Sequence, residues 1–246
     1  QLDVGTGLLA LFHSDLDQLA DAQTLADGYD GVILPMKTAD GALGYVSALP
    51  LAADAGASSG DPDRNEALRA LNDTPGLYTV AQVSCLRDSA LVREEPGLSL
   101  HRVSGSPWLD ESRQGWLDPA PPPGQSSPSD QEVQDYLVGL MVELAQLGFD
   151  EILLTDCGFP TQGDLDSLRA VEEKEETLET FCRQLQGALA DTPVTLSVMG
   201  QRDSVTADPV SGQTTALLAT FGRVWTQAED QEALAAFDPV VLPADT

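Results

Sequence analysis

The stretch from Gly148 to Pro160 most constrains how this chain can fold, because a helix, a tight link and a buried strand meet there. Seven apolar residues recur at helical spacing before it: Val133, Tyr136, Leu137, Leu140, Met141, Leu144 and Leu147. Ser129 with Glu132 forms a capping-box start, and Gly148 is a helix stop. Residues 152–155 form an apolar run too short for a helix, which predicts a buried strand. Asp156 follows directly, where α/β folds place their ligands.

Strands and helices alternate along the whole chain, which favours a parallel sheet. Six strands are predicted, at residues 7–12, 31–36, 77–83, 152–155, 194–198 and 240–242, with a possible seventh within 217–225. Neither a Gly-x-Gly-x-x-Gly fingerprint nor a phosphate-loop lysine motif is present, which disfavours an open dinucleotide-binding sheet. We therefore expect an α/β fold of the (β/α)8 TIM-barrel type, incomplete or irregular, with six to seven clear strands.

The segment from about 84 to 129 shows little periodicity and carries many polar and aromatic residues. A long ordered loop inside a compact domain is usually functional, so we place it on the functional side. Residues 121–129 are rich in Pro and Ser, but this spacer is too short to link two domains. Residues 1–246 are therefore expected to form a single domain.

The charge of the chain excludes several classes of partner. Its 246 residues carry 40 acidic and 12 basic side chains, a formal net charge of -28. Such a surface repels phosphate backbones and anionic lipid, so neither nucleic acid nor an anionic membrane is an expected partner. No apolar run is long enough to span a bilayer, so membrane insertion is not expected either. His13 and His101 are isolated, and the three cysteines are widely spaced, so no metal and no cofactor are predicted. Cys85 and Cys157 follow neighbouring strands. They supply either a reactive thiol or a disulfide or, as we favour, they are two buried apolar thiols.

Four segments in sequence carry a family resemblance. They are 31–41 with 45–47, 76–83 with Arg87-Asp88, Trp108-Leu-Asp110 with 115–119, and 147–152 with Phe159-Pro160. In this order, from about Gly7 to Pro243, they resemble the glycoside-hydrolase barrel domain of unknown function that is distantly related to the alpha-amylase clan. The resemblance implies a TIM barrel and a carbohydrate ligand, and it allows an extracytoplasmic location.

The departures from this family bear on catalysis. Pro35 and Thr155 stand where the family pattern has aspartates, and Gly158 stands where it has an arginine. The resemblance therefore carries over Lys37, Asp40, Trp116 and Asp118 but not the acidic centre. Asp156 lies one position beyond the expected place, and a one-residue shift sends a side chain to the other face of a strand. A bulge in the strand, or the end of the strand before Asp156, would be needed for its side chain to reach the position of the family's aspartate.

Glycoside hydrolysis needs two carboxyl groups that flank the sugar bond. The catalytic candidates are Asp156, Asp203 and Asp118, whereas Asp150 and Glu151 precede the strand and are expected on the opposite, structural side. The candidates for substrate binding are Lys37, Asp40, Arg87, Trp108, Trp116 and Arg202. The alternatives are packing or loop anchoring for the tryptophans, ion pairing for the arginines, and a solvated loop position for Lys37.

The sequence favours a glycoside hydrolase-like barrel that acts on or binds carbohydrate, with a degenerate catalytic centre. One alternative is an active glycosidase that uses Asp156 with a second carboxylate. Another is an acidic protein-interaction scaffold without a small ligand. The sequence fixes neither the sugar nor the oligomeric state.

Overall fold

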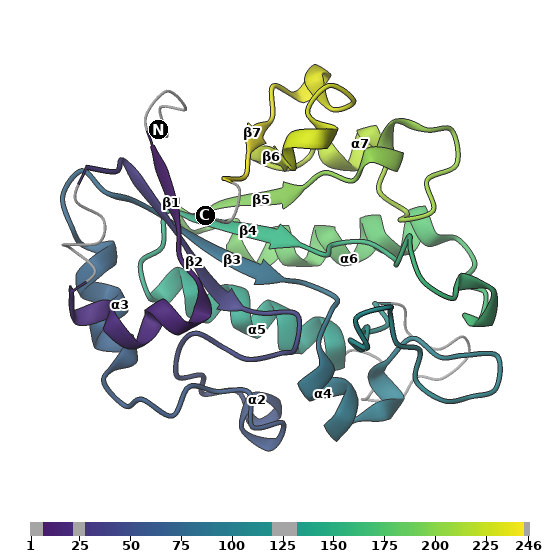
Figure 1. Ribbon diagram of the computed structural model, residues 1–246, viewed down its shortest axis with the longest axis horizontal. Helices are drawn as coiled ribbons and strands as arrows, with labels where there is room; N and C mark the ends of the chain where they lie inside the picture. The colour runs from purple at the N-terminus through teal and green to yellow at the C-terminus, as the bar shows by residue number, and fades with distance from the viewer. Residues whose placement is uncertain (1–6, 22–27, 120–131, 244–246) are drawn as a thin grey trace.

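A computed structural model describes residues 7–21, 28–119 and 132–243 of the chain. Seven parallel strands form one sheet in the order β1-β2-β3-β4-β5-β6-β7, so each strand pairs with its predecessor. They are β1 (Leu8–Ala10), β2 (Gly31–Lys37), β3 (Tyr78–Ser84), β4 (Glu151–Thr155), β5 (Thr195–Met199), β6 (Arg223–Thr226) and β7 (Val240–Val241). The sheet curls into a half-barrel (Figure 1), which confirms the prediction of an incomplete TIM-barrel-like fold.

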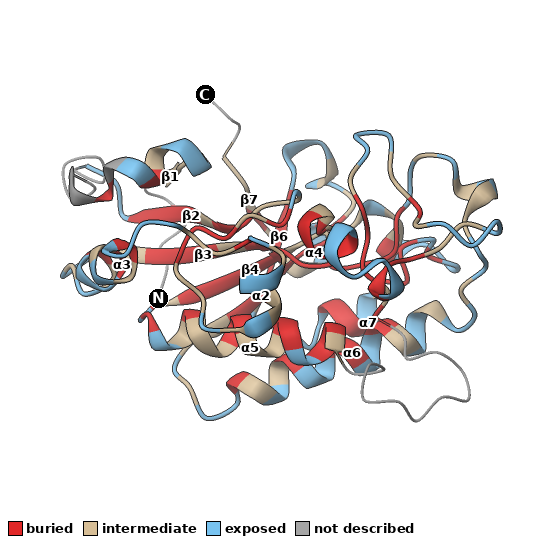
Figure 2. Ribbon diagram, turned by 90° about the horizontal axis from the view of Figure 1, so that it is seen from below, coloured by how far each residue is buried: buried red, intermediate tan, exposed pale blue. Residues whose placement is uncertain are grey.

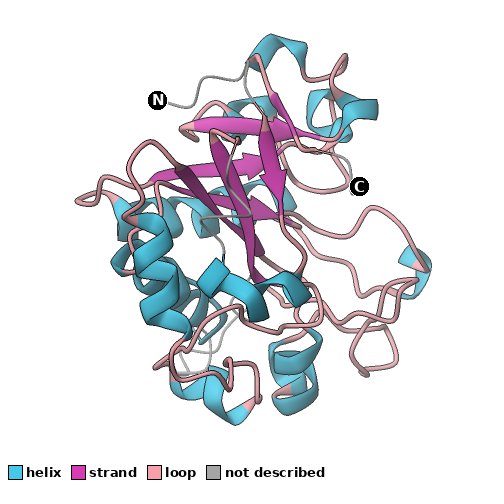
Figure 3. Ribbon diagram, turned by 60° about the vertical axis from the view of Figure 1, so that its left-hand side comes forward, coloured by secondary structure: helices cyan, strands magenta, loops and turns pink. Residues whose placement is uncertain are grey.

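Helices pack on the outer face of this sheet, and long loops gather at the carboxyl ends of the strands (Figures 1 and 3). The α-helices are α2 (Pro50–Asp54), α3 (Arg64–Asn72), α4 (Ser89–Glu94), α5 (Glu132–Gln146), α6 (Lys174–Leu189) and α7 (Thr215–Leu218). Short 3-10 helices occupy His13–Asp21, Pro96–Leu98, Leu165–Ser167, Arg202–Val205, Ala228–Asp230 and Ala235–Phe237. Within the described ranges, no helix is long and apolar enough to span a bilayer.

The main core lies between the sheet and the helices, because each buried strand presents alternate residues to its two faces. Val32, Leu34 and Met36 of β2 point outward and belong to the same buried cluster as residues of α5 and α6, the neighbouring helices below the sheet in Figure 2. Between them, Ile33 points to the inner face of the barrel. The inner face is filled by a small apolar cluster: Ile33, Val80, Leu153, Met199, Trp225 and Val240.

A buried carboxylate completes the inner face near the amino ends of the strands. Glu151 is fully buried and is the first residue of β4, not a residue before the strand as expected. It accepts hydrogen bonds from the Tyr78 hydroxyl (2.8 Å), the Ser197 hydroxyl (2.5 Å) and the Trp225 indole N–H (2.6 Å). Arg223 Nη1 lies 3.4 Å from its Oε2. Glu151 thus joins β3, β4, β5 and β6, far from the loops at the carboxyl ends.

The long segment after β3 has more structure than its lack of periodicity indicated. It contains α4 and the 3-10 turn at Pro96–Leu98, and isolated bridges such as Arg87 to Trp116 and Ser99 to Leu117 hold it against itself. The Ser129 cap and the Pro/Ser-rich spacer at 121–129 lie outside the described residues.

Candidate functional site

A cavity of about 240 Å³ opens at the carboxyl ends of β3, β4 and β5. Three loops line it: Arg87, Asp110, Glu111, Ser112 and Trp116 after β3, Asp156 and residues 158–162 after β4, and Gln201 after β5. The carboxyl ends of barrel strands are where such folds gather ligand-binding side chains. The cavity is therefore the candidate functional site.

Asp156 reaches the cavity because β4 ends at Thr155, one residue before it. Its backbone adopts a left-handed conformation with φ of 48°, which is uncommon for a residue with a side chain and marks a locally strained position. Asp156 Oδ2 accepts a hydrogen bond of 2.7 Å from the Ser84 hydroxyl. Because the strand has already ended, the side chain of Asp156 enters the cavity although Asp156 lies one position beyond the aspartate of the family pattern.

Arg87 joins the two aspartates of the cavity. Its Nη2 lies 3.0 Å from Asp110 Oδ2 and its Nη1 lies 3.6 Å from Asp156 Oδ1. Because one guanidinium contacts both, the contacted oxygens lie no more than about 9 Å apart, a limit that admits either type of glycosidase pair. The guanidinium also lies 5.8 Å from the centre of the Trp116 ring, whose N–H donates to Asp110 over 3.1 Å.

A buried ion pair lies beneath this arrangement. Lys37 Nζ is 3.2 Å from Asp88 Oδ2, with side-chain exposures of 1% and 0%. The same ammonium donates to the carbonyl oxygens of Ser84 (2.6 Å) and Arg87 (2.8 Å). Lys37 is turned to this position by a register shift between Pro35 and Lys37, where proline cannot donate to the ladder. Lys37 therefore holds the backbone that carries Ser84 and Arg87 and does not line the cavity.

Asp88 links the ion pair to the loop that carries Asp110. Its Oδ1 caps α4 by accepting from the Leu91 N–H over 2.8 Å. On the first turn of α4, the Ser89 hydroxyl accepts from the Gly115 N–H over 2.9 Å, next to Trp116. The polypeptide from Ser84 to Trp116 is thus held at several points around the buried Lys37–Asp88 ion pair.

A model of the family described as "Putative glycosyl hydrolase domain" matches residues 16–221. The chain belongs to this family. No match was found among curated proteins.

Solved structures share the fold of this glycosyl hydrolase family member. A hypothetical protein from Ruminiclostridium thermocellum is 23% identical with a TM-score of 0.63, over 76% of this chain and 96% of that one. The PgaB (BpsB) glycoside hydrolase domain from Bordetella bronchiseptica is 16% identical with a TM-score of 0.56, over 95% and 81%. The Thermus thermophilus alpha-galactosidase TtGalA, in complex with stachyose, is 16% identical with a TM-score of 0.50, over 93% of this chain and 47% of its own. The chain thus spans about half of that galactosidase, and these likenesses establish the fold alone.

Among the residues singled out from the sequence, the structure brings Asp156, Arg87 and Trp116 together in the cavity. Asp203 and Asp118 do not line it. Asp203 instead accepts from the hydroxyl (2.7 Å) and the backbone N–H (2.8 Å) of Ser211, which closes the loop after β5.

The remaining predicted binding residues lie outside the cavity lining. Trp108 is fully buried and donates its indole N–H to the Asp164 carbonyl over 2.9 Å. Arg202 is 73% exposed and lies 3.6 Å from Asp230. Asp40 forms a turn; burial raises its pKa, but hydrogen bonds from Thr38 and backbone N–H groups outweigh this, and the net pKa is lowered.

Sequence reasoning missed several polar residues of the site, among them Asp110, Glu111, Gln201 and Ser84. A signal existed for Asp110, which ends the Trp108-Leu-Asp110 segment of the family resemblance. Nothing in the local pattern distinguished the other three from ordinary loop and strand polar residues.

The three cysteines lie beneath the site as free, fully buried thiols. Cys157 Sγ and Cys182 Sγ are 3.7 Å apart. Hydrogen bonding to Cys157, together with burial, raises the pKa of Cys85, so its thiolate is disfavoured. Across the described residues, no group of three or more His, Cys, Asp or Glu side chains could hold a metal ion.

Proposed function

We propose that the cavity binds a carbohydrate and that its catalytic centre is degenerate. One observation carries the proposal: a single arginine forms ion pairs with both aspartates of a cavity at the carboxyl ends of the strands. The alpha-amylase clan relation and the extracytoplasmic location stay predictions from the sequence.

The carbohydrate is supported by the family and by the content of the cavity. Its description as a glycosyl hydrolase domain, together with the glycoside hydrolases among the structural neighbours, makes a sugar the first ligand to consider. Guanidinium, carboxylate, amide and hydroxyl groups line the cavity beside the Trp116 indole. Sugar hydroxyls both donate and accept hydrogen bonds, and aromatic rings offer them an apolar surface.

The degenerate centre is supported by how the two aspartates are used. A glycosidase needs one carboxyl group that donates a proton and another that acts as nucleophile or base. Here both aspartates serve as anionic partners of Arg87, and each also accepts a hydrogen bond, Asp110 from Trp116 and Asp156 from Ser84. Pro35 and Thr155 replace the acids that the family resemblance leads one to expect.

A second candidate function is an active glycosidase that uses Asp156 with Asp110. The upper limit of about 9 Å between their contacted oxygens allows it, since this limit is compatible with an inverting or a retaining pair. In this case Arg87 would have to leave one carboxylate when substrate enters.

The two candidates are separated by measuring binding and turnover in the same samples. The wild type, Asp156→Asn and Asp110→Asn are incubated with a panel of aryl glycosides and oligosaccharides, with binding followed by calorimetry. Asp203→Asn is the matched control, because that aspartate also accepts two hydrogen bonds but lies outside the cavity lining. We expect oligosaccharide binding without hydrolysis, weakened in both cavity variants and unchanged in the control. Hydrolysis that Asp156→Asn abolishes would establish the active glycosidase. If no member of the panel bound, the proposal that the cavity binds a carbohydrate would be refuted.

A further inference from the structure

The cavity carries more negative than positive charge, and we infer that its sugar is a cationic one, a hexosamine with a free amino group. This inference rests on the proposed carbohydrate-binding function. It concerns which sugar is taken, not whether one is taken.

Three carboxylates and one basic side chain line the cavity. Asp110, Glu111 and Asp156 face a single Arg87, whose guanidinium is already shared by the two aspartates. Lys174 lies nearby, 5.6 Å from the Phe159 ring, but it donates to the Val210 carbonyl and is not part of the lining. A ligand therefore meets an excess of negative charge.

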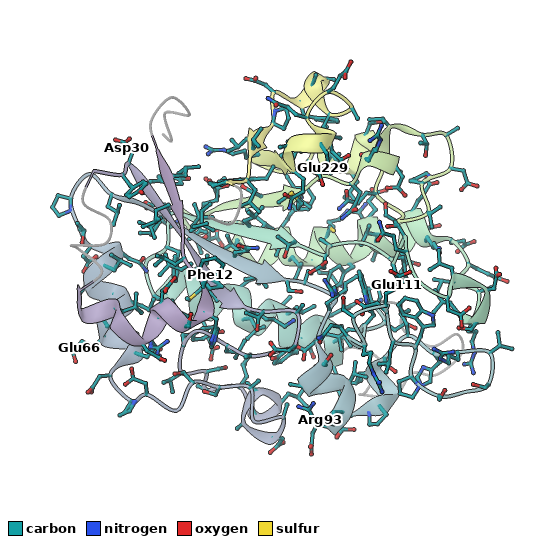
Figure 4. The ribbon with its side chains drawn as sticks, in the orientation of Figure 1. Phe12, Asp30, Glu66, Arg93, Glu111 and Glu229 are labelled. Atoms are coloured by element: carbon teal, nitrogen blue, oxygen red, sulfur yellow. The ribbon has the colours of Figure 1, made fainter. Side chains whose placement is uncertain are left out.

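Glu111 is the carboxylate that remains for a ligand. Within the described part of the chain, its side chain makes no ion pair, unlike those of the two aspartates. Glu111 is exposed, and a Cβ at Gly163 would lie 3.7 Å from its Cγ, so the stem of Glu111 lies beside the loop after β4. Figure 4 shows Glu111 among the loops on the right-hand side, at the carboxyl ends of the strands.

The charge balance discriminates among sugar classes. A uronic acid or a sulfated sugar would place an anion against three carboxylates, which costs affinity. A neutral hexose gains hydrogen bonds but nothing from the excess charge. An ammonium group donates up to three hydrogen bonds, and Glu111 offers it a carboxylate without any other ion pair in the described structure.

The experiment compares β-1,4-linked tetramers of glucosamine, N-acetylglucosamine and glucose, which differ only at the second carbon of each ring. Affinities are measured by calorimetry at low and at moderate salt, with the wild-type chain. One partly exposed ion pair corresponds to about two- to fivefold in affinity, so we expect the glucosamine tetramer to bind at least that much more tightly. Added salt should reduce this preference.

The variant Glu111→Gln should remove most of the preference for glucosamine, because it should lower the affinity for the glucosamine tetramer far more than the affinity for the glucose tetramer. Glu94→Gln is the matched control, because it makes the same change of charge at an exposed position at the end of α4, outside the cavity lining. It also detects general attraction of a cationic ligand to a chain with a net charge of -28.

The outcomes separate this inference from the proposed function. Equal affinities for glucosamine and glucose tetramers would overturn the inference and leave carbohydrate binding intact. A glucosamine preference that Glu94→Gln reduces as much as Glu111→Gln would also overturn it, since the attraction would then belong to the whole surface. The absence of binding by every tetramer would overturn both.

Discussion

Replacing Lys37 by methionine should destabilise the protein by about 3–5 kcal/mol, which is the usual cost of removing one partner of a buried ion pair. The side chains of Lys37 and Asp88 are 1% and 0% exposed, so water cannot take the place of the lost ammonium. Asp88 would keep one backbone hydrogen bond, from Leu91, and the carbonyl oxygens of Ser84 and Arg87 would each lose a donor. A loss of this size is at least about a fifth of the stability of a typical domain, which is about 5–15 kcal/mol.

The second variant tests whether the uncompensated charge is the cause. Adding Asp88→Asn to Lys37→Met removes that charge, while asparagine still caps a helix N-terminus. We expect the double variant to recover about 2 kcal/mol relative to Lys37→Met alone, because the two residues are in direct contact and their effects are not additive. Urea unfolding followed by circular dichroism gives the free energies of Lys37→Met, Asp88→Asn and the double variant, with an unchanged slope if the native state stays compact.

Two results would refute this reasoning. A cost below about 1 kcal/mol for Lys37→Met would mean that water or a rearranged donor replaces the ammonium. If the loss of stability in the double variant equalled the sum of the losses in the two single variants within about 0.5 kcal/mol, the charges of Lys37 and Asp88 would not interact beneath the cavity.

Three further predictions concern buried groups. Burial, followed by nearby carboxylates, raises the pKa of three of the four tyrosines, namely Tyr45, Tyr78 and Tyr136. Unfolded tyrosine ionises near pH 10, so stability that is present below this value should fall as pH rises above it. The tyrosinate absorbance of these three residues should appear together with the loss of circular dichroism. Because Tyr29 is exposed, absorbance of more than one tyrosine before unfolding would contradict this. The three cysteine thiols should react with a thiol reagent at pH 8 only in denaturant, and fast labelling of native protein would count against their burial. Gly41→Ala should cost about 2–4 kcal/mol in urea unfolding, since φ is 93° and the added Cβ would clash with Asp88 Oδ1. Gly56→Ala, with positive φ but open space, should cost about 1–2 kcal/mol, and equal costs would argue against the contact.

The strands could be predicted because buried parallel strands are nearly continuous apolar runs. The predicted run at 152–155 and the observed β4 (Glu151–Thr155) differ by one residue. Strand β6 (Arg223–Thr226) stayed ambiguous because it is short and begins and ends with polar residues, directly after a helical turn at α7. The length of an apolar run, more than its composition, decided whether a strand could be predicted from the sequence.

The site could be predicted only where it depends on a strand end. Asp156 follows from the end of β4, a local feature of the sequence. Asp110 reaches the cavity through contacts between distant segments, such as the Ser89 to Gly115 hydrogen bond, and no periodicity encodes these. Lys37 was expected either at the mouth of the barrel or in a solvated loop, whereas a register shift after Pro35 places it beneath the cavity floor.

The network around Glu151 has a consequence for the order in which the chain folds. Its partners Tyr78, Ser197 and Trp225 belong to β3, β5 and β6, so the carboxylate can be buried with all its donors only after β6 has docked. Earlier docking would enclose an unsatisfied charge, and we therefore expect the inner layer to close late, as one cooperative event. Trp225→Phe should then speed unfolding and leave the refolding rate nearly unchanged.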